Sequence, residues 1–326
     1  MICAHGEELF QQAAEADRTI CFEAAVAGGI PVINAITTAL TGNRIESIEG
    51  ILNGTSNFIL TQMLSKNQSY DEALKLAQEL GYAEADPTLD VDGTDAAQKL
   101  AILIRLAFST DISVDQMILK GIDPLMLSDL ESADALGYRI KLLALARLND
   151  GRLEASVQPT LVRSNRALAH TNGADNIVTL TGSAVGRLRL AGAGAGQMPT
   201  ASAVMADVVD YASGRARQTF QAVLRNRSAD SFEIQSQEAP ERRYYLRCTV
   251  DDRPHVLADV TDILGRHGIS ISSLHQDEPT NDTDHPTARL VIMTHRSDEG
   301  RMRRADQDLQ QLDCVQGIPL RLPVAE

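Results

Sequence analysis

The sequence predicts an α+β fold, in which a mixed, largely antiparallel sheet with helices is followed by a small ferredoxin-like βαββαβ unit. Two strand-like pairs within residues 138–193 are joined by turns, which favours antiparallel pairing. Apolar residues three or four positions apart between residues 70 and 107 indicate helices. Residues 225–241 have few large apolar side chains and one proline, and are predicted to form a linker. We therefore expect domains at residues 1–224 and 242–326.

The first sixty residues are expected to alternate helices with strands. The helix signals are apolar periodicity and a proline at a helix start, and the strand signals are short apolar stretches that end in turns. In chain order, the predicted elements are an amphipathic helix over 1–18, a short strand at the start of 19–33, a helix opened by Pro31, a strand over 45–51, a turn at Asn53-Gly54 and a helix from about Thr55.

The middle of the chain carries clear helix boundaries. Ser69 and Glu72 are spaced as a capping box for a helix that is expected to stop at Gly81. An acidic, turn-rich loop and a strongly apolar helix follow. Farther along, a strand pair leads to the glycine-rich turn 192–196, after which Pro199 is predicted to open another helix.

Composition excludes several classes of protein. The formal net charge is −14, so a nucleic-acid partner is not expected. No apolar run approaches a membrane span, and residues 1–18 lack the pattern of a secretory signal, so we expect a cytoplasmic protein. The four cysteines are far apart in the sequence, which supports neither a zinc site nor a disulfide framework. We expect them to be small buried apolar residues.

Asp95 and Lys99 lie one helical turn apart on the apolar helix. Gln98 and Arg105 are expected to mark its solvent-facing side, so the pair is expected to face a partly buried cavity. A lysine beside carboxylates in a desolvated pocket can be tuned for proton transfer, which arginine cannot do at neutral pH. The alternative is an ordinary surface ion pair.

Three further patterns suggest binding, and each has a structural alternative. The acidic loop is either a solvated loop, a set of ligands for a hard cation, or a receptor for a substrate ammonium group; its spacing does not match an EF-hand. The turn 192–196 precedes a helix start that could meet an anionic cofactor group, or is a tight turn. Carbonyl groups around Gly28 and Gly29 hold a monovalent cation, or these glycines allow close packing.

Residues 77–99 resemble the signature of homoserine dehydrogenases, A-x3-G-hydrophobic-small-x2-[DNS]-P-x2-D-x-x-G-x-D-x3-K. The segments FEAAVAGGIPVI, EGILNGTSNFIL and GAGAGQMPTASAV are also similar to that family, in its order, so the resemblance covers about residues 4–215. Residues 242–326 resemble an ACT domain. The matching residues of the signature are Ala77, Gly81, Tyr82, Ala83, Asp86, Pro87, Asp90, Gly93, Asp95 and Lys99.

The resemblance implies NAD- or NADP-dependent interconversion of L-homoserine and L-aspartate 4-semialdehyde, within threonine, methionine and isoleucine biosynthesis. Lys99 would transfer a proton at the substrate hydroxyl with Asp95 beside it, and Glu84 and Asp90 would hold the amino group of homoserine. The resemblance further implies that Gly54, Thr55 and Gly81 line the substrate pocket, that Gly192, Gly194 and Gly196 approach the cofactor, and that Glu23 with the carbonyls of Val26, Gly28 and Ile30 binds sodium.

The resemblance also implies regulation and assembly. Threonine would be the feedback effector at the ACT domain, and a dimer or tetramer would form through the sheet. The family begins with a nucleotide-binding Rossmann half, of which residues before Glu23 are expected to be only a remnant. The alternative function is therefore a non-catalytic module for amino-acid binding and dimerisation.

Overall fold

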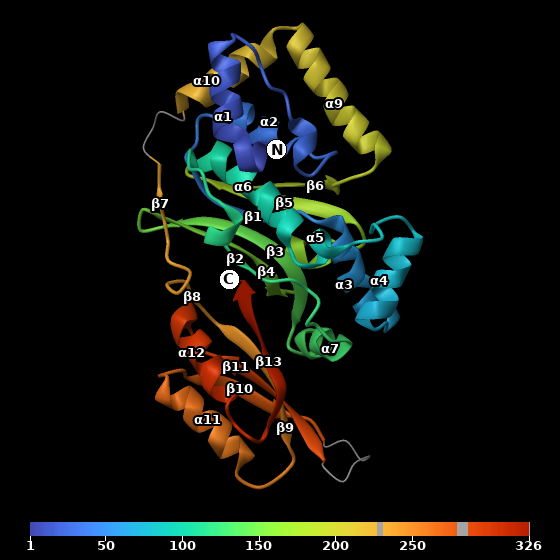
Figure 1. Ribbon diagram of the computed structural model, residues 1–326, viewed down its shortest axis with the longest axis vertical. Coiled ribbons are helices and arrows are strands. Elements are labelled where there is room, and N and C mark those ends of the chain that lie inside the picture. The colour runs from blue at the N-terminus through green and yellow to red at the C-terminus, as the bar shows by residue number, and fades with distance from the viewer. Residues whose placement is uncertain (227–230, 279–285, 326) are drawn as a thin grey trace. The chain divides into compact units, whose positions relative to one another are not determined.

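The computed structural model describes residues 1–226, 231–278 and 286–325 (Figure 1). The chain forms two compact units. The first contains Met1–Asp123, Lys141–Gln158 and His170–Gln235, and the second contains Pro124–Ile140, Pro159–Ala169 and Ser236–Glu326. No helix among the described residues is long and apolar enough to cross a membrane.

The first unit is built on a sheet in the order β4-β3-β1-β5-β6, in which β1 pairs antiparallel with β3 and β5, and β5 pairs antiparallel with β6. Two short strands pair in parallel with β4, so the sheet is mixed and largely antiparallel, as predicted. The strands are β1 (Ile45–Ile51), β2 (Ile118–Leu119), β3 (Tyr138–Asn149), β4 (Arg152–Arg163), β5 (Asp175–Gly182), β6 (Gly186–Ala193) and β7 (Glu233–Ile234).

The helices of the first unit include the long apolar helix that the sequence predicts. The predicted capping box of Ser69 and Glu72 is present at the start of a different helix, α4, and Gly81 follows the end of α4 with φ +75°. The helices are α1 (Ile2–Glu15), α2 (Val32–Asn34), α3 (Gly54–Lys66), α4 (Tyr70–Glu79), α5 (Thr88–Val91), α6 (Thr94–Phe108), α9 (Gln197–Ala212) and α10 (Arg215–Asn226). The short helix α8 (Ala167–His170) belongs to the second unit except for its last residue, His170.

Several predictions of local structure are wrong. The predicted strand near residue 20 is absent; a 3-10 helix at Glu23–Ala25 takes its place, because the Glu23 amide bonds to the Asp207 carboxylate rather than to a strand. Arg105 does not face solvent: it is buried, pairs with Asp111 and donates to the Ile2 carbonyl of α1. The linker predicted at residues 225–241 stays a prediction; within it, α10 extends to Asn226 and β7 covers Glu233–Ile234.

The second unit contains the predicted βαββαβ order. Its four main strands pair antiparallel in the order β10-β11-β9-β13, and both helices bury apolar side chains in one core, which confirms the ferredoxin-like arrangement. The elements are β9 (Tyr244–Asp251), α11 (Val256–Arg266), β10 (Ile271–Gln276), β11 (Thr287–Thr294), α12 (Glu299–Leu309) and β13 (Val315–Ala325), with the short pair β8 (Glu241–Arg242) and β12 (Ser297–Asp298).

This unit also recruits α7 (Leu127–Ala135), which precedes β9 by more than a hundred residues. Asp129 of α7 is fully buried, accepts a 2.7 Å hydrogen bond from Arg247 Nε and a 3.1 Å bond from the Tyr245 hydroxyl, and thereby joins α7 to β9. The domain boundaries at 224 and 242 stay a prediction, and the second unit includes segments that lie outside them.

Candidate active site

The site forms where the start of α3, the short helix α5 and the first turns of α6 meet. Asn53 is the N-cap of α3, and its side-chain oxygen accepts a 2.8 Å bond from the Ser56 amide. Asp90 lies in α5 and Asp95 in the first turn of α6. Gly93 has φ +88° between them and packs against Leu119, so the turn that brings the two carboxylates together favours glycine.

Asp95 and Lys99 form the predicted pair. Lys99 Nζ donates to Asp95 Oδ2 at 2.7 Å and to the Leu52 carbonyl at 3.2 Å. The Lys99 side chain is 23% exposed and the Asp95 side chain 30%, so the pair is half-buried. Two of the three ammonium protons of Lys99 are thus held by the protein, which aims the nitrogen.

Within this cluster, the pKa of the Asp90 carboxyl is raised above its ordinary value. Burial raises the pKa of its carboxyl, and the negative charge of Asp95 adds to the rise. A hydrogen bond from Asn53 and the positive charge of Lys99 act in the opposite direction. A half-buried carboxylate beside a positioned lysine is the arrangement expected in a site that binds a cationic group and transfers a proton.

The other predicted pocket residues surround this cluster to different extents. The Thr55 hydroxyl donates to the Tyr82 carbonyl at 2.6 Å, which ties α3 to the loop after Gly81. A Cβ on Gly54 would lie 2.7 Å from the Ala174 carbonyl, so only glycine fits there. Glu84 is exposed, and its backbone carbonyl accepts from Gln78 at 3.2 Å, so its role as an ammonium ligand stays a prediction.

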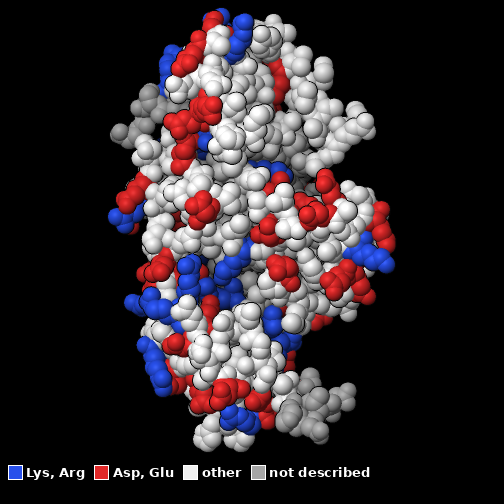
Figure 2. Space-filling model, viewed as in Figure 1, with Lys and Arg blue, Asp and Glu red and all other residues white. Residues whose placement is uncertain are grey.

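Acidic side chains gather over α4 and α5 on the face shown in Figure 2, so the approach to this cluster is negatively charged. Among the residues that the structure describes, no three His, Cys, Asp or Glu side chains are grouped to hold a metal ion. The cysteines are all free; Cys248 and Cys314 are buried as expected and Cys3 is half-buried, but Cys21 is exposed, contrary to prediction, because the strand expected around it does not form.

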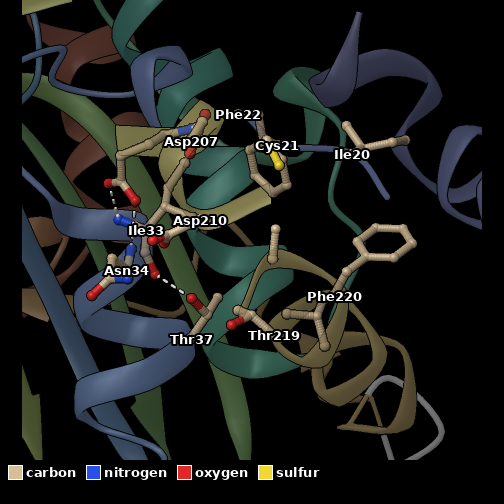
Figure 3. Close-up of a pocket in the computed structure, with 13 residues that line it drawn as sticks. Ile20, Cys21, Phe22, Ile33, Asn34, Thr37, Asp207, Asp210, Thr219 and Phe220 are labelled. Atoms are coloured by element: carbon tan, nitrogen blue, oxygen red, sulfur yellow. Dashed lines mark hydrogen bonds between the residues drawn. The ribbon is translucent and has the colours of Figure 1, made fainter. Parts of the chain in front are cut away.

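A second acidic region contains Glu23, which is buried and lines one pocket together with Asp207 and Asp210. Figure 3 shows this pocket, with Asp207 and Asp210 of α9 and Ile33 and Asn34 of α2 labelled. The two carboxylate oxygens of Glu23 accept bonds of 2.9 and 2.8 Å from the Ile33 and Asn34 amides at the start of α2. Burial raises the pKa of the Glu23 carboxyl to about 7, and the charges of Asp207 and Asp210 add to the rise. A cavity of about 60 Å³ lies beside these three carboxylates.

The glycine-rich segments pack against each other. The Gly29 amide donates to the Ala193 carbonyl at 3.0 Å, and a Cβ on Gly28 would lie 2.8 Å from the Gly194 carbonyl. Close packing therefore accounts for these glycines. Gly196 has φ +108° and is the N-cap of α9, with no side-chain cap, and Gly192 lies in β6. Val26 and Ile30 are buried in the same loop as Gly28.

One residue of the site, Asn53, and one buried lysine that contacts α3, Lys141, were missed from the sequence. Asn53 was named only as a turn residue, although it contacts both Asp90 and Asp95. Lys141 is 3% exposed in β3 and donates to Asn57 of α3 at 3.0 Å and to the Thr171 carbonyl at 2.6 Å. A lysine inside the apolar stretch IKLLALA was the available signal, because lysine is rarely buried without several acceptors.

Comparison with known proteins gives consistent matches. A family model described as homoserine dehydrogenase matches residues 31–209, and one described as ACT domain matches residues 244–314. The chain is 43% identical over 330 residues to the homoserine dehydrogenase of Pseudomonas aeruginosa, covering 100% of this chain and 76% of that protein. The chain therefore spans about three quarters of the length of this relative.

Similar solved structures are also homoserine dehydrogenases. A homoserine dehydrogenase from Thiobacillus denitrificans is similar with a TM-score of 0.89 and 41% identity, covering 100% of this chain and 74% of the other. A hyperthermophilic archaeal homoserine dehydrogenase, solved in complex with NADPH, has a TM-score of 0.57 and 28% identity, covering 65% of this chain and 61% of the other.

Proposed function

Because the chain belongs to the homoserine dehydrogenase family and carries an ACT domain, we propose that the Asp95–Lys99 cluster interconverts L-homoserine and L-aspartate 4-semialdehyde. The observation that carries this proposal is the half-buried lysine held by Asp95 and the Leu52 carbonyl next to a second carboxylate, Asp90. A lysine held in this way can exchange a proton with a substrate oxygen.

Lys99 acts at the oxygen that changes between hydroxyl and carbonyl. In the direction of aldehyde reduction, its third ammonium proton goes to the oxygen as negative charge develops there. In the reverse direction the neutral amine takes up the hydroxyl proton. Asp95 keeps the nitrogen in place and stabilises its positive form, at a distance of 2.7 Å.

Asp90 is proposed to receive the substrate ammonium group, together with Glu84 from the exposed part of the loop. Partial burial makes an ammonium contact at Asp90 stronger than one in bulk water, and an ammonium ion would in turn favour the ionised carboxylate. Gly54, Thr55 and Gly81 would line the adjoining surface, with Gly54 at the first position of α3.

A nicotinamide cofactor, NADP or NAD, is proposed near Gly192, Gly194 and Gly196. The exposed start of the sixteen-residue helix α9 fits an anionic group, since the Gln197 and Met198 amides have no intrahelical acceptor. When bound, the cofactor supplies or accepts the hydride. In support, the archaeal relative is described as a complex with NADPH.

The remaining proposals concern regulation, assembly and a cation. A sodium ion would be held by Glu23 and the carbonyls of Val26, Gly28 and Ile30; the raised pKa of the buried Glu23 fits a site that favours a compensating cation. Threonine is proposed as the ligand of the ACT domain, and a sheet-mediated homodimer or a tetramer as the assembly, in the cytoplasm.

The test is turnover of L-homoserine with NADP+ or NAD+, comparing Lys99→Ala with the parent chain. We expect at least a hundredfold loss of kcat because the proton-transfer group is removed. Lys66→Ala, at the exposed end of α3, is the matched control and should leave kcat unchanged. Near-normal turnover by Lys99→Ala would contradict the proposed role, and a parent chain that binds threonine but never NADPH would favour a non-catalytic module.

A further inference from the structure

The side chain of Asn53 makes three hydrogen bonds that join three helices. Its oxygen caps α3 through the Ser56 amide at 2.8 Å. Its nitrogen donates to Asp90 Oδ1 at 2.7 Å and to Asp95 Oδ2 at 2.8 Å. The residue is 4% exposed, so solvent does not replace these bonds.

The partners fix the orientation of the amide. An asparagine side chain offers two N–H donors and one carbonyl acceptor. If the amide were reversed, its oxygen would face two carboxylates and its nitrogen would face the Ser56 N–H, so all three contacts would be repulsive. Both N–H groups are therefore committed to the two carboxylates.

This arrangement addresses an electrostatic problem in the site. Asp90 and Asp95 each place an oxygen within hydrogen-bonding distance of one nitrogen, so their negative charges are close neighbours. Only Asp95 is paired directly with Lys99 at 2.7 Å. Like charges at this distance favour protonation of one member, and burial acts in the same direction on Asp90. Hydrogen bonds donated to the ionised forms oppose both effects.

We propose that Asn53 is a positioning residue that orients Asp90 and Asp95 side by side and keeps Asp90 ionised, so that Asp90 can take a substrate ammonium while Asp95 holds Lys99. The role in substrate binding rests on the proposed function; the effect on the two carboxylates does not. Asn53 touches neither the substrate nor the proton that moves, but acts through the groups that do.

The capping and positioning roles can be separated by Asn53→Ser. Serine is as good an N-cap as asparagine, so α3 should keep its start, but the two N–H donors are lost. Asn53→Asp keeps both the cap and the size and replaces the donors with a third carboxylate. Ser69→Ala, which removes the cap of α4 away from the site, is the control for a purely structural loss.

The first measurement is a pH titration of 13C-labelled aspartate carboxyl groups by NMR in the full chain. We expect the pKa of Asp90 to rise by about one unit in Asn53→Ser, more in Asn53→Asp, and not at all in Ser69→Ala. Unchanged titration in both Asn53 variants would overturn the inference.

The second measurement is calorimetric binding of L-homoserine from pH 5 to 8. Asn53→Ser should bind L-homoserine more weakly at the acidic end of this range, by up to roughly tenfold, and the difference in affinity should narrow as pH rises, because Asp90 becomes ionised again. If Asn53→Ser binds L-homoserine with the same affinity as the parent chain at every pH, Asn53 acts only as the N-cap of α3. If the parent chain does not bind L-homoserine, the proposed function fails, while the titration still decides whether Asn53 controls the carboxylates.

Discussion

The Glu23 carboxyl is held by two backbone amides at the start of α2, yet burial and two neighbouring aspartates raise its pKa to about 7. In the unfolded chain the same group would lose its proton near pH 4.5. Between these values the folded chain binds more protons, so the free energy of unfolding should fall as pH rises, by up to about 1.4 kcal/mol per pH unit. Below about pH 4.5 this contribution is fully present.

We therefore expect urea unfolding in sodium-free buffer to show this decline between about pH 4.5 and 7, and Glu23→Gln to flatten it. Sodium should reduce the decline in the parent chain, because a bound cation favours the ionised carboxylate. Equal pH dependence in Glu23→Gln would show that another group is responsible. A sodium effect that persists in the variant would argue against a cation at Glu23.

At the scale of elements, the loop before α2 and the turn before α9 are held together by contacts that leave no room for a side chain. An alanine Cβ at Gly28 would meet the Gly194 carbonyl at 2.8 Å, whereas one at Gly42 meets nothing within 4 Å. Neither glycine has positive φ, so the comparison isolates packing from backbone strain. Gly28→Ala should lower the free energy of unfolding by about 1–3 kcal/mol, and Gly42→Ala by less than about 0.5 kcal/mol.

Urea denaturation of the two variants measures this difference directly. If Gly28→Ala were as stable as Gly42→Ala, the two segments would have to separate readily, and the packing explanation for these glycines would fail. Reduced NADPH binding by Gly28→Ala, with Gly42→Ala unaffected, would add that the packed turn positions the cofactor.

At the scale of the molecule, the second unit is assembled from three separate stretches of chain. The buried ion pair of Asp129 and Arg247 joins two of these stretches. Removing Asp129 would leave the Arg247 guanidinium buried without its partner, at a cost of about 3–5 kcal/mol. Asp134, on the same helix, pairs with Arg139 at the surface, and such a pair contributes about 0–1 kcal/mol. Asp129→Ala should therefore lower the melting temperature far more than Asp134→Ala; equal effects would contradict the role of the buried pair.

The local signals that predicted the fold were those that depend on near neighbours in sequence. The capping box at Ser69 and the βαββαβ order were readable, and so was the i,i+4 pair of Asp95 and Lys99, because each is set within a few residues or by repeated periodicity. Arg105 was misplaced because its acceptor on α1 is about a hundred residues away. The link from Asn53 to Asp90 was missed for the same reason, since it spans 37 residues.

The discontinuous second unit has a practical consequence for engineering. A fragment cut at residue 242, which is where the sequence suggests a boundary, would carry Arg247 and Tyr245 without the carboxylate of Asp129 that satisfies both. An ACT domain fused to an unrelated enzyme as this fragment would therefore carry the Arg247 guanidinium exposed and without its carboxylate partner. A fragment intended for fusion to another protein would therefore need to include α7, either in the same chain or as a separate peptide that binds to it.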